Sequence, residues 1–251
     1  MDLGLTDRVA IVTGAGGGIG AATARILRDE GCRVLAVDRA PGGVEALERE
    51  SDGSVVAHVA DIVDEAAATG IGPAAVEHFG RLDIVATCAG VVGSMDSPAL
   101  HEETLENWDR TVDINLRGTF LTVKGSMPFL VEAGWGRVVT VGSVAGQVGS
   151  LSAGPAYGAS KAGVLGLTRW LAKQVGPHGV TVNCVHPGTV VSPMTEAQFD
   201  AATFDARAKA TLLGRNGEVE ELGSVIAFLA SAQAAYITGA HIDVNGGLYM
   251  G

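Results

Sequence analysis

The sequence predicts an α/β fold built around a mostly parallel sheet. Short runs rich in β-branched residues alternate along the chain with longer segments of helical period. The short runs are apolar throughout, which is typical of strands that helices cover on both faces. Successive parallel strands of this kind are joined by right-handed crossovers, so the chain should wind around one sheet.

Seven segments have the composition of strands: Val9–Val12, Val34–Val37, Val55–Val59, Leu82–Thr87, Val138–Val141, Val180–Val185 and His241–Val244. Six segments between them have helical period, at about 19–30, 43–50, 64–79, 104–132, 156–176 and 218–231. The stretch from Gly188 to about Gly217 shows neither pattern. Long loops in compact domains are usually functional. We therefore expect one domain over residues 1–251, with a substrate loop inserted at about 188–217.

Composition restricts the possible functions. The 251 residues are 47% hydrophobic and 18% charged, as in globular proteins. A net charge of -11 without a run of Lys or Arg argues against nucleic acid or a membrane surface as partner. Val9–Val12 is too short for a signal core, and Cys32, Cys88 and Cys184 form no metal-binding pattern. We expect a cytoplasmic protein that holds no metal.

A glycine-rich turn follows the first strand. It reads Thr13-Gly14-Ala15-Gly16-Gly17-Gly18-Ile19-Gly20, and a helical pattern begins within it. Glycine strings alone are weak signals, but a strand, such a turn and a helix form the context of a dinucleotide site. Without Cβ atoms the backbone can approach a pyrophosphate, whose charge is met by N–H groups at the helix start. This turn therefore predicts dinucleotide binding.

Asp38, at the end of the second strand, bears on the choice of dinucleotide. A carboxylate there accepts hydrogen bonds from ribose hydroxyls and repels a 2′-phosphate, which favours NAD over NADP. Gly17 adds no basic side chain to the turn, in agreement, whereas Arg39 could hold a 2′-phosphate and argues the other way. Asp61, after the third strand, could reach the adenine edge, although capping of the next helix would also explain it.

Four polar residues suggest proton transfer. Tyr157 and Lys161 lie four residues apart in a helical segment and so share one face. An isolated pair of this kind is usually a routine surface pair. Ser143, however, follows the fifth strand at the carboxyl edge, where ligands bind in open parallel sheets, and Asn115 lies in the helix before that strand. The glycine-rich turn belongs to the same edge.

Together these motifs resemble the short-chain dehydrogenase/reductase family over nearly the whole chain: TGxxxGxG at Thr13–Gly20, Asp61, Ala89-Gly90, Asn115, Ser143, Tyr157-x-x-x-Lys161 and Pro187-Gly188. The resemblance implies a doubly wound Rossmann fold with a seven-stranded sheet in the order 3-2-1-4-5-6-7. It also implies a cofactor site made by Gly14, Gly18, Ile19, Gly20, Asp38, Asp61, Ile62, Ala89, Gly90, Tyr157, Lys161, Pro187, Gly188, Val190 and Ser192.

The resemblance further assigns chemical roles. Tyr157 would be the acid/base for the substrate oxygen, and Lys161 would lower its pKa and bind the nicotinamide ribose. Ser143 would hold the substrate oxygen, and Asn115 would keep a water chain connected to Lys161. The physics agrees in direction, because an ammonium and an oxidised nicotinamide both favour phenolate over a phenol of pKa about 10. The expected reaction interconverts a secondary alcohol and a ketone with NAD.

The chain departs from the family pattern in two places. Thr87-Cys88 stands where the family commonly has two asparagines, so we expect a local change in hydrogen bonding without loss of activity. The hydroxyl that usually meets the cofactor carboxamide is matched by Ser192, and Thr189 offers another.

The substrate side is mostly apolar. Candidates for its wall are Val92, Met95, Ser143, Ala145, Gln147, Val148, Leu151, Tyr157, Val190, Met194, Phe199 and Phe204, of which Ser143, Ala145, Gln147, Tyr157 and Met194 are the assigned set. Such a lining fits a hydrophobic or cyclic alcohol or ketone. Packing between short helices of the loop would equally explain Met194, Phe199 and Phe204.

Two other functions remain open. Many family members reduce 3-oxoacyl chains on acyl carrier protein, but those enzymes usually prefer NADPH, and an acidic carrier would be repelled by this acidic chain. A basic patch around Arg207, Lys209 and Arg215 could still dock one. A more distant alternative is a non-catalytic NAD-binding sensor, although a sensor has no need of a proton relay.

The helical segment at 156–176 also predicts self-association. It carries apolar residues around more than one face, including Leu167 and Trp170, whereas a helix on a sheet needs one apolar stripe. The 104–132 segment and the C-terminal run Ile237–Gly251 show a similar surplus. The family resemblance implies a homotetramer or a homodimer.

Overall fold

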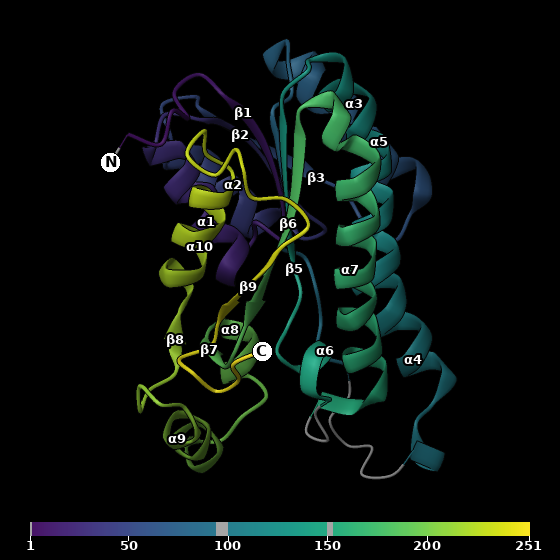
Figure 1. Cartoon of the computed structure of the whole chain (residues 1–251), viewed down its shortest axis with the longest axis vertical. Coiled ribbons are helices and arrows are strands. Elements are labelled where there is room, and N and C mark those ends of the chain that lie inside the picture. The colour runs from purple at the N-terminus through teal and green to yellow at the C-terminus, as the bar shows by residue number, and fades with distance from the viewer. Residues whose placement is uncertain (1, 94–99, 150–152) are drawn as a thin grey trace.

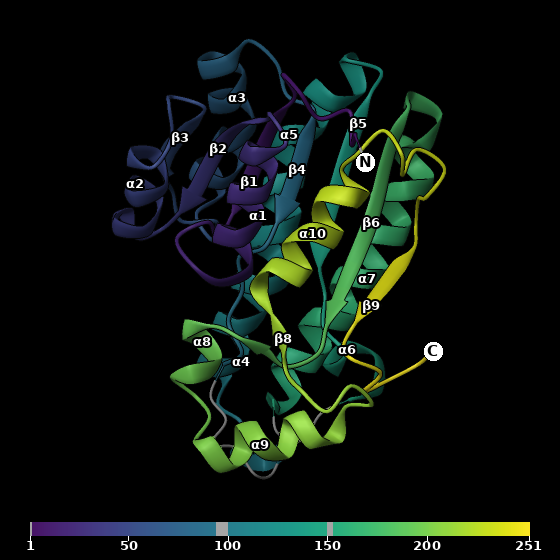
Figure 2. The same cartoon turned by 90° about the vertical axis from the view of Figure 1, so that its left-hand side faces the viewer.

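The computed structural model describes residues 2–93, 100–149 and 153–251. Seven parallel strands form one sheet in the order β3-β2-β1-β4-β5-β6-β9, which confirms the predicted order with β9 as the seventh strand (Figures 1 and 2). The strands are β1 Val9–Thr13, β2 Arg33–Asp38, β3 Val55–Val59, β4 Ile84–Thr87, β5 Gly136–Val141, β6 Val180–Pro187 and β9 His241–Val244.

Helices cover both faces of the sheet (Figure 1). One face carries α1 Gly18–Asp29, α2 Pro41–Arg49 and α10 Val219–Leu229. The other carries α3 Glu65–Phe79, α4 Leu105–Val112, α5 Gly118–Glu132 and α7 Gly154–Val175, with the short α6 Ala145–Val148 packed against α7.

Two apolar clusters, one on each face of the sheet, form the core. Successive residues of β1 point into opposite clusters, so Ala10 and Val12 pack against Leu27 on one face while Val9 and Ile11 belong to the other. Every residue of β1 is buried. This double coverage explains the unbroken apolar runs in the sequence.

The predicted helix at 104–132 is interrupted in the structure. A π-helical segment, Asp113–Arg117, separates α4 from α5. Single π-helical turns inside α-helices frequently mark functional sites because the extra residue re-aims side chains. Asn115 lies in the middle of this segment, and its side chain is buried.

The expectation of an irregular stretch from Gly188 to Gly217 was wrong. The chain there forms β7 Val190–Val191, α8 Pro193–Glu196, α9 Ala201–Ala210 and β8 Gly217–Glu218, and β7 pairs with β8 in a small parallel sheet. Side-chain caps define both helix starts: Ser192 accepts from the Thr195 amide at 3.3 Å, and Asp200 accepts from the Thr203 amide at 2.8 Å. The stretch is thus a structured subdomain at the carboxyl edge (Figure 2).

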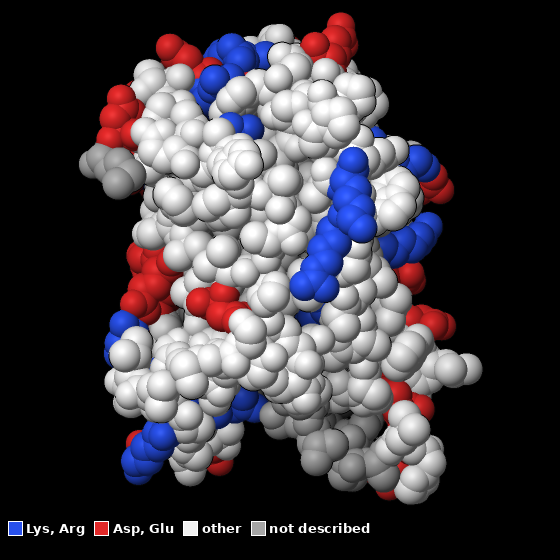
Figure 3. Space-filling view, in the orientation of Figure 1, with Lys and Arg blue, Asp and Glu red and all other residues white. Residues whose placement is uncertain are grey.

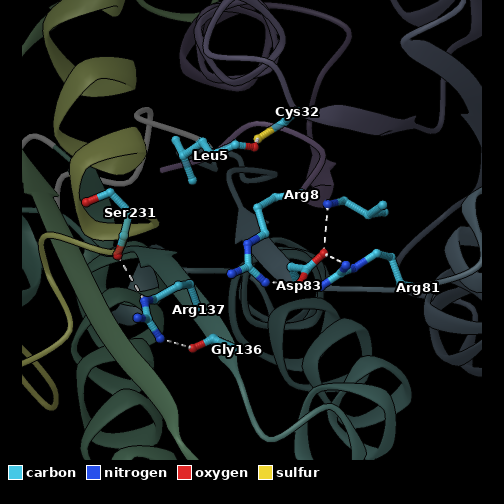
Figure 4. A network of polar contacts seen from close by, with 9 residues as sticks. Leu5, Arg8, Cys32, Arg81, Asp83, Gly136, Arg137 and Ser231 are labelled. Carbon is cyan, nitrogen blue, oxygen red and sulfur yellow. Dashed lines mark hydrogen bonds and ion pairs between the residues drawn. The ribbon is translucent and has the colours of Figure 1, made fainter. Parts of the chain in front are cut away.

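A buried carboxylate holds the opposite, amino edge of the sheet together (Figure 4). Asp83 precedes β4 and is fully buried. It accepts hydrogen bonds from the Val9 amide at 2.9 Å, from Arg8 Nη1 at 2.8 Å and from Arg81 Nη2 at 2.6 Å. Because Val9 is the first residue of β1 and Arg8 directly precedes it, this carboxylate fixes the start of β1 against β4.

We predict that Asp83→Ala lowers the stability of the fold without changing the site at the other edge. The substitution leaves the Val9 amide and two guanidinium groups without their carboxylate, and the partial exposure of both arginines moderates the cost to about 2–3 kcal/mol. A chain of this size should lose about 5–10 °C in melting temperature. Thermal denaturation measures this loss. Asp29→Ala is the control, since that carboxylate pairs with Arg28 at the surface. Equal melting temperatures for the two variants would contradict the structural role of Asp83.

Candidate active site

A cleft of about 340 Å³ opens at the carboxyl edge of the sheet, between the ends of β1 and β4. Its walls include eleven residues that the sequence assigned to the cofactor or the substrate: Gly14, Gly18, Ile19, Gly20, Asp38, Asp61, Ile62, Ala89, Gly90, Ser192 and Met194. Nine other residues line the cleft although the sequence did not assign them to it: Gly17, Val37, Arg39, Ala60, Val63, Cys88, Val91, Ile114 and Pro193. Most of these adjoin assigned residues at the strand ends, a position that could have identified them.

Close backbone packing explains the glycines of the turn. Gly14 has a φ of +70°, and a Cβ there would lie 2.7 Å from the Ala89 backbone at the end of β4. A Cβ on Gly20 would lie 2.1 Å from the Gly14 carbonyl oxygen. The turn leads into α1 through Gly17, which supplies no side-chain cap. The first amides of α1 therefore have no side-chain acceptor there, which suits a pyrophosphate.

The Asp38 carboxylate lines the same cleft and is held by two backbone amides. Its Oδ2 accepts from Gly16 at 3.0 Å and its Oδ1 from Ala40 at 3.0 Å. A carboxylate offers about four acceptor sites, so capacity remains for two ribose hydroxyls. The cleft, the glycine turn and this carboxylate together fit a dinucleotide.

Asp61 lines the cleft as well, and the structure tests the interpretation that it caps the next helix. Helix α3 is capped by Asp64, which accepts from the Ala67 amide at 2.8 Å. Asp61 instead accepts from the Val63 amide at 3.0 Å. The helix-capping explanation for Asp61 is therefore wrong, and its carboxylate is placed at the cleft wall.

Asn115 clamps the backbone just beyond β4. Its Oδ1 accepts from the Val91 amide at 2.8 Å, and its Nδ2 donates to the Val91 carbonyl at 2.9 Å and to Ser160 Oγ at 3.1 Å. Ser160 Oγ in turn donates to the Tyr157 carbonyl at 2.8 Å. One buried amide thereby connects the cleft wall to the first turns of α7.

Lys161 is buried next to the end of β5. Its Nζ donates to the Val141 carbonyl at 2.9 Å, and burial lowers the pKa of the ammonium to about 8. A Cβ on Gly90 would lie 3.3 Å from that Nζ and 3.0 Å from Asn115 Oδ1. The glycine of the Ala89-Gly90 pair therefore leaves room for the lysine beside the cleft.

Tyr157 lies next to Lys161, as the helical spacing predicts: Nζ is 5.9 Å from the centroid of the tyrosine ring. Ser143 lies close enough to Tyr157 to affect the pKa of its phenol, and Ser143 Oγ accepts from the Ala145 amide at 3.2 Å. Among the protein's own groups burial dominates and raises the pKa of the phenol, while Ser143 lowers it. The lowering of this pKa by Lys161 together with an oxidised nicotinamide therefore stays a prediction.

The side chains of the substituted pair Thr87-Cys88 make little use of hydrogen bonds. The Thr87 hydroxyl is buried and has no partner among the described residues. Cys88 Sγ lies 4.0 Å from Thr23 Oγ1, and burial raises the pKa of the thiol to about 12. The thiol that lines the cleft therefore stays protonated near neutral pH and is a poor nucleophile.

The hydroxyls after Pro187-Gly188 face different surroundings. Ser192 lines the cofactor cleft, whereas Thr189 Oγ1 accepts from Arg207 Nη1 at 3.4 Å and faces α9. The Gly188 amide donates to the Val244 carbonyl at 3.1 Å, which fixes this segment on β9. Of the two hydroxyls, the one that lines the cleft is therefore Ser192. The other residues assigned to the cofactor, Tyr157, Lys161, Pro187, Gly188 and Val190, are not among those that line the cleft.

The candidate substrate residues are only partly brought together. Ala145 is buried beside Ser143, and Gln147 keeps a buried Oε1 without a partner among the described residues. Phe199 and Phe204 pack edge-to-face at 5.8 Å, as expected if the short helices pack on each other. Val148 is exposed, and Met194 lines the cofactor cleft. Met95 and Leu151 lie outside the described residues.

The described part of the chain offers neither a membrane span nor a metal cluster. None of its helices is both long and apolar enough to cross a membrane. The same residues contain no group of three or more His, Cys, Asp or Glu side chains arranged to hold a metal ion.

Known proteins resemble this chain along its whole length. A family model described as Enoyl-(Acyl carrier protein) reductase matches residues 14–249. The (3R)-3-hydroxyacyl-CoA dehydrogenase of Rattus norvegicus is 37% identical, in an alignment that covers 99% of this chain and 98% of the rat enzyme. The D-threitol dehydrogenase of Mycolicibacterium smegmatis is 39% identical, covering 98% and 94%. The crystal structure of gox2181 superposes with a TM-score of 0.91 at 34% identity, covering 98% and 97%. The chain belongs to the short-chain dehydrogenase/reductase family of oxidoreductases.

Proposed function

We propose that this protein is an NAD-dependent oxidoreductase that interconverts a secondary alcohol and a ketone, with Tyr157 as the acid/base. One observation carries the proposal: a tyrosine, a serine and a buried lysine meet beside a cleft shaped for a dinucleotide. Such an acid/base set has no purpose in a nucleotide sensor, so the arrangement supports catalysis over sensing.

Each side chain has a role that its surroundings support. The nicotinamide supplies the hydride chemistry when bound, and the protein supplies position and electrostatics. Ser143 holds the substrate oxygen, and Tyr157 exchanges a proton with that oxygen. Because burial raises the pKa of Tyr157, the phenolate needs nearby positive charge, which Lys161 and the oxidised cofactor ring provide together. Asn115 keeps the segment after β4 and the start of α7 in register.

Asp38 supports NAD as the cofactor. The Gly16 and Ala40 amides hold its two oxygens in place at the cleft, where these oxygens can also accept hydrogen bonds from ribose hydroxyls. A 2′-phosphate would meet this carboxylate as a like charge. Arg39 also lines the cleft, but it follows Asp38 and does not remove that repulsion.

A hydrophobic or cyclic alcohol fits this protein better than an acyl chain on a carrier protein. The basic patch considered for carrier docking is largely neutralised, because Lys209 pairs with Asp205 at 2.5 Å and Arg215 with Glu221 at 2.6 Å. The net charge of -11 would repel an acidic carrier as well. We propose that the segment at 188–217 contacts the substrate, since its candidate substrate residue Met194 reaches the cleft where the cofactor would lie.

We further propose a homotetramer or homodimer of this cytoplasmic enzyme, with α7 in the contact. Figure 3 shows a broad face with few charges, crossed by one basic strip along α7. Trp170 on α7 is 59% exposed, and Met250 near the C-terminus is 76% exposed. Large apolar side chains exposed to this degree on one molecule favour burial against another copy.

Tyr157→Phe tests the proposed mechanism. The variant keeps the ring and loses the proton-exchanging oxygen, so turnover should fall by roughly 10²–10⁴ while NADH affinity stays within about twofold. Steady-state kinetics and NADH titration measure the two quantities. Tyr236→Phe is the matched control, because that tyrosine is fully exposed. Turnover of Tyr157→Phe equal to that of the control would contradict the role of Tyr157.

Asp38→Ala tests the cofactor choice. Removal of the carboxylate loses hydrogen bonds to the ribose and relieves repulsion of a 2′-phosphate. We expect NADH to bind roughly tenfold more weakly and NADPH more tightly than to the wild type. Titration of both nucleotides checks this. A wild-type protein that already prefers NADPH would contradict the choice of NAD. An unchanged ratio of NADH to NADPH affinity in the variant would contradict the role of Asp38.

Trp170→Glu tests the assembly. A charge at the centre of an apolar contact should convert the oligomer to smaller species at micromolar concentration. Light scattering after size exclusion reads the mass directly, with Val59→Glu on β3, at the opposite edge of the sheet, as the control. A wild-type monomer would end the assembly proposal.

A further inference from the structure

Gly43 touches the glycine-rich turn from outside the cofactor cleft. It lies in the first turns of α2, and a Cβ at this position would be 2.1 Å from the carbonyl oxygen of Gly16 and 2.6 Å from its Cα. Real Cβ atoms do not approach backbone this closely. Two glycines, one in the phosphate turn and one in α2, therefore form a direct contact between backbones.

The same Gly16 touches Asp38 on its other side. Its amide donates to Asp38 Oδ2 at 3.0 Å, and a Cβ on Gly16 would lie 2.8 Å from that oxygen. The Gly16 peptide thus lies between α2 and the carboxylate assigned to the adenosine ribose. Its position, and with it one of the two hydrogen bonds that orient Asp38, depends on how closely α2 can approach.

Helix α2 cannot retreat without disturbing the same carboxylate. Its inner side chains Val44 and Leu47 are fully buried in the core. Ala40, the residue just before α2, supplies the other amide that holds Asp38, and this amide donates to Oδ1 at 3.0 Å. A side chain on Gly43 must therefore displace either Gly16 or the α2 segment, and each displacement breaks one of the two bonds to Asp38.

We propose that Gly43 is a positioning residue for cofactor selectivity: by letting α2 rest on Gly16, it holds the Asp38 carboxylate toward the adenosine ribose. The inference rests on the proposed use of NAD by this cleft. Gly43 does not line the cofactor cleft itself. It acts through Asp38, so its effect is confined to the adenosine end of the cofactor.

The test compares Gly43→Ala with Gly42→Ala. Gly42 is the neighbouring residue of the same helix and is exposed, and a Cβ added there would have no other atom within 4 Å. We expect Gly43→Ala to weaken NADH binding roughly tenfold, as for loss of one hydrogen bond to a charged group, and to leave NADPH binding within about twofold. The kcat at saturating NAD should also stay within about twofold, while Gly42→Ala matches the wild type in every readout.

A double-mutant cycle with Asp38→Ala shows whether Gly43 acts through that carboxylate. The inference requires that Gly43→Ala has no further effect on NADH affinity once Asp38 is alanine. It is overturned if the effect persists in that background, or if Gly43→Ala and Gly42→Ala behave alike. A wild type without measurable NADH affinity would instead defeat the proposed function, together with everything that rests on it.

Gly16→Ala provides a second route if Gly43→Ala folds poorly. The three atoms nearest to its Cβ would all belong to the Asp38 side chain, which can rotate away, so the fold should tolerate it. The inference predicts that NADH affinity falls more than NADPH affinity in this variant as well. An unchanged ratio of NADH to NADPH affinity in this variant would show that the contact with Gly16 does not orient Asp38.

Discussion

The position of β1 between β2 and β4 is the constraint on which the site depends. Thr13 at the end of β1 is level with Val37 on one side and Thr87 on the other. The chain leaves these strand ends toward opposite faces of the sheet, and a crevice remains between them. Hydrogen bonds close its sides, from the Ala15 amide to the Val37 carbonyl at 3.0 Å and from the Ala89 amide to the side-chain Oγ1 of Thr13 at 3.3 Å. The dinucleotide cleft is a consequence of strand order.

The residues proposed for catalysis come from other elements and must be tied to that crevice. Asn115 makes the connection through buried hydrogen bonds to Val91 and Ser160, and Ser160 bonds the Tyr157 carbonyl. The π-helical segment places the Asn115 amide where it can make these bonds. Lys161 is fixed separately by the Val141 carbonyl at the end of β5. The groups proposed to transfer the proton are therefore held at the same sheet edge as the cofactor cleft.

Much of this architecture could be predicted from the sequence, because strands covered on both faces produce apolar runs that are hard to mistake. The glycine turn and the Tyr157–Lys161 spacing likewise follow from local geometry. Helix α9 was missed because its polar and apolar residues show no clear helical period, although Asp200 as a capping residue was an available signal. The contact of Gly43 with Gly16 was not predictable, since it depends on how two elements pack. The raised pKa of Tyr157 reflects burial, which spacing does not reveal.

Hydride and proton transfer with NAD at this edge of the sheet is the central proposal. The most direct measurement is NADH formation by the wild-type protein on a panel of cyclic, aryl, steroidal and acyl-thioester alcohols, run in parallel with NADP. We expect turnover of at least one hydrophobic or cyclic secondary alcohol, faster with NAD than with NADP. Tight binding of NADH without turnover of any substrate, even at high enzyme concentration, would contradict the proposal and favour a nucleotide sensor.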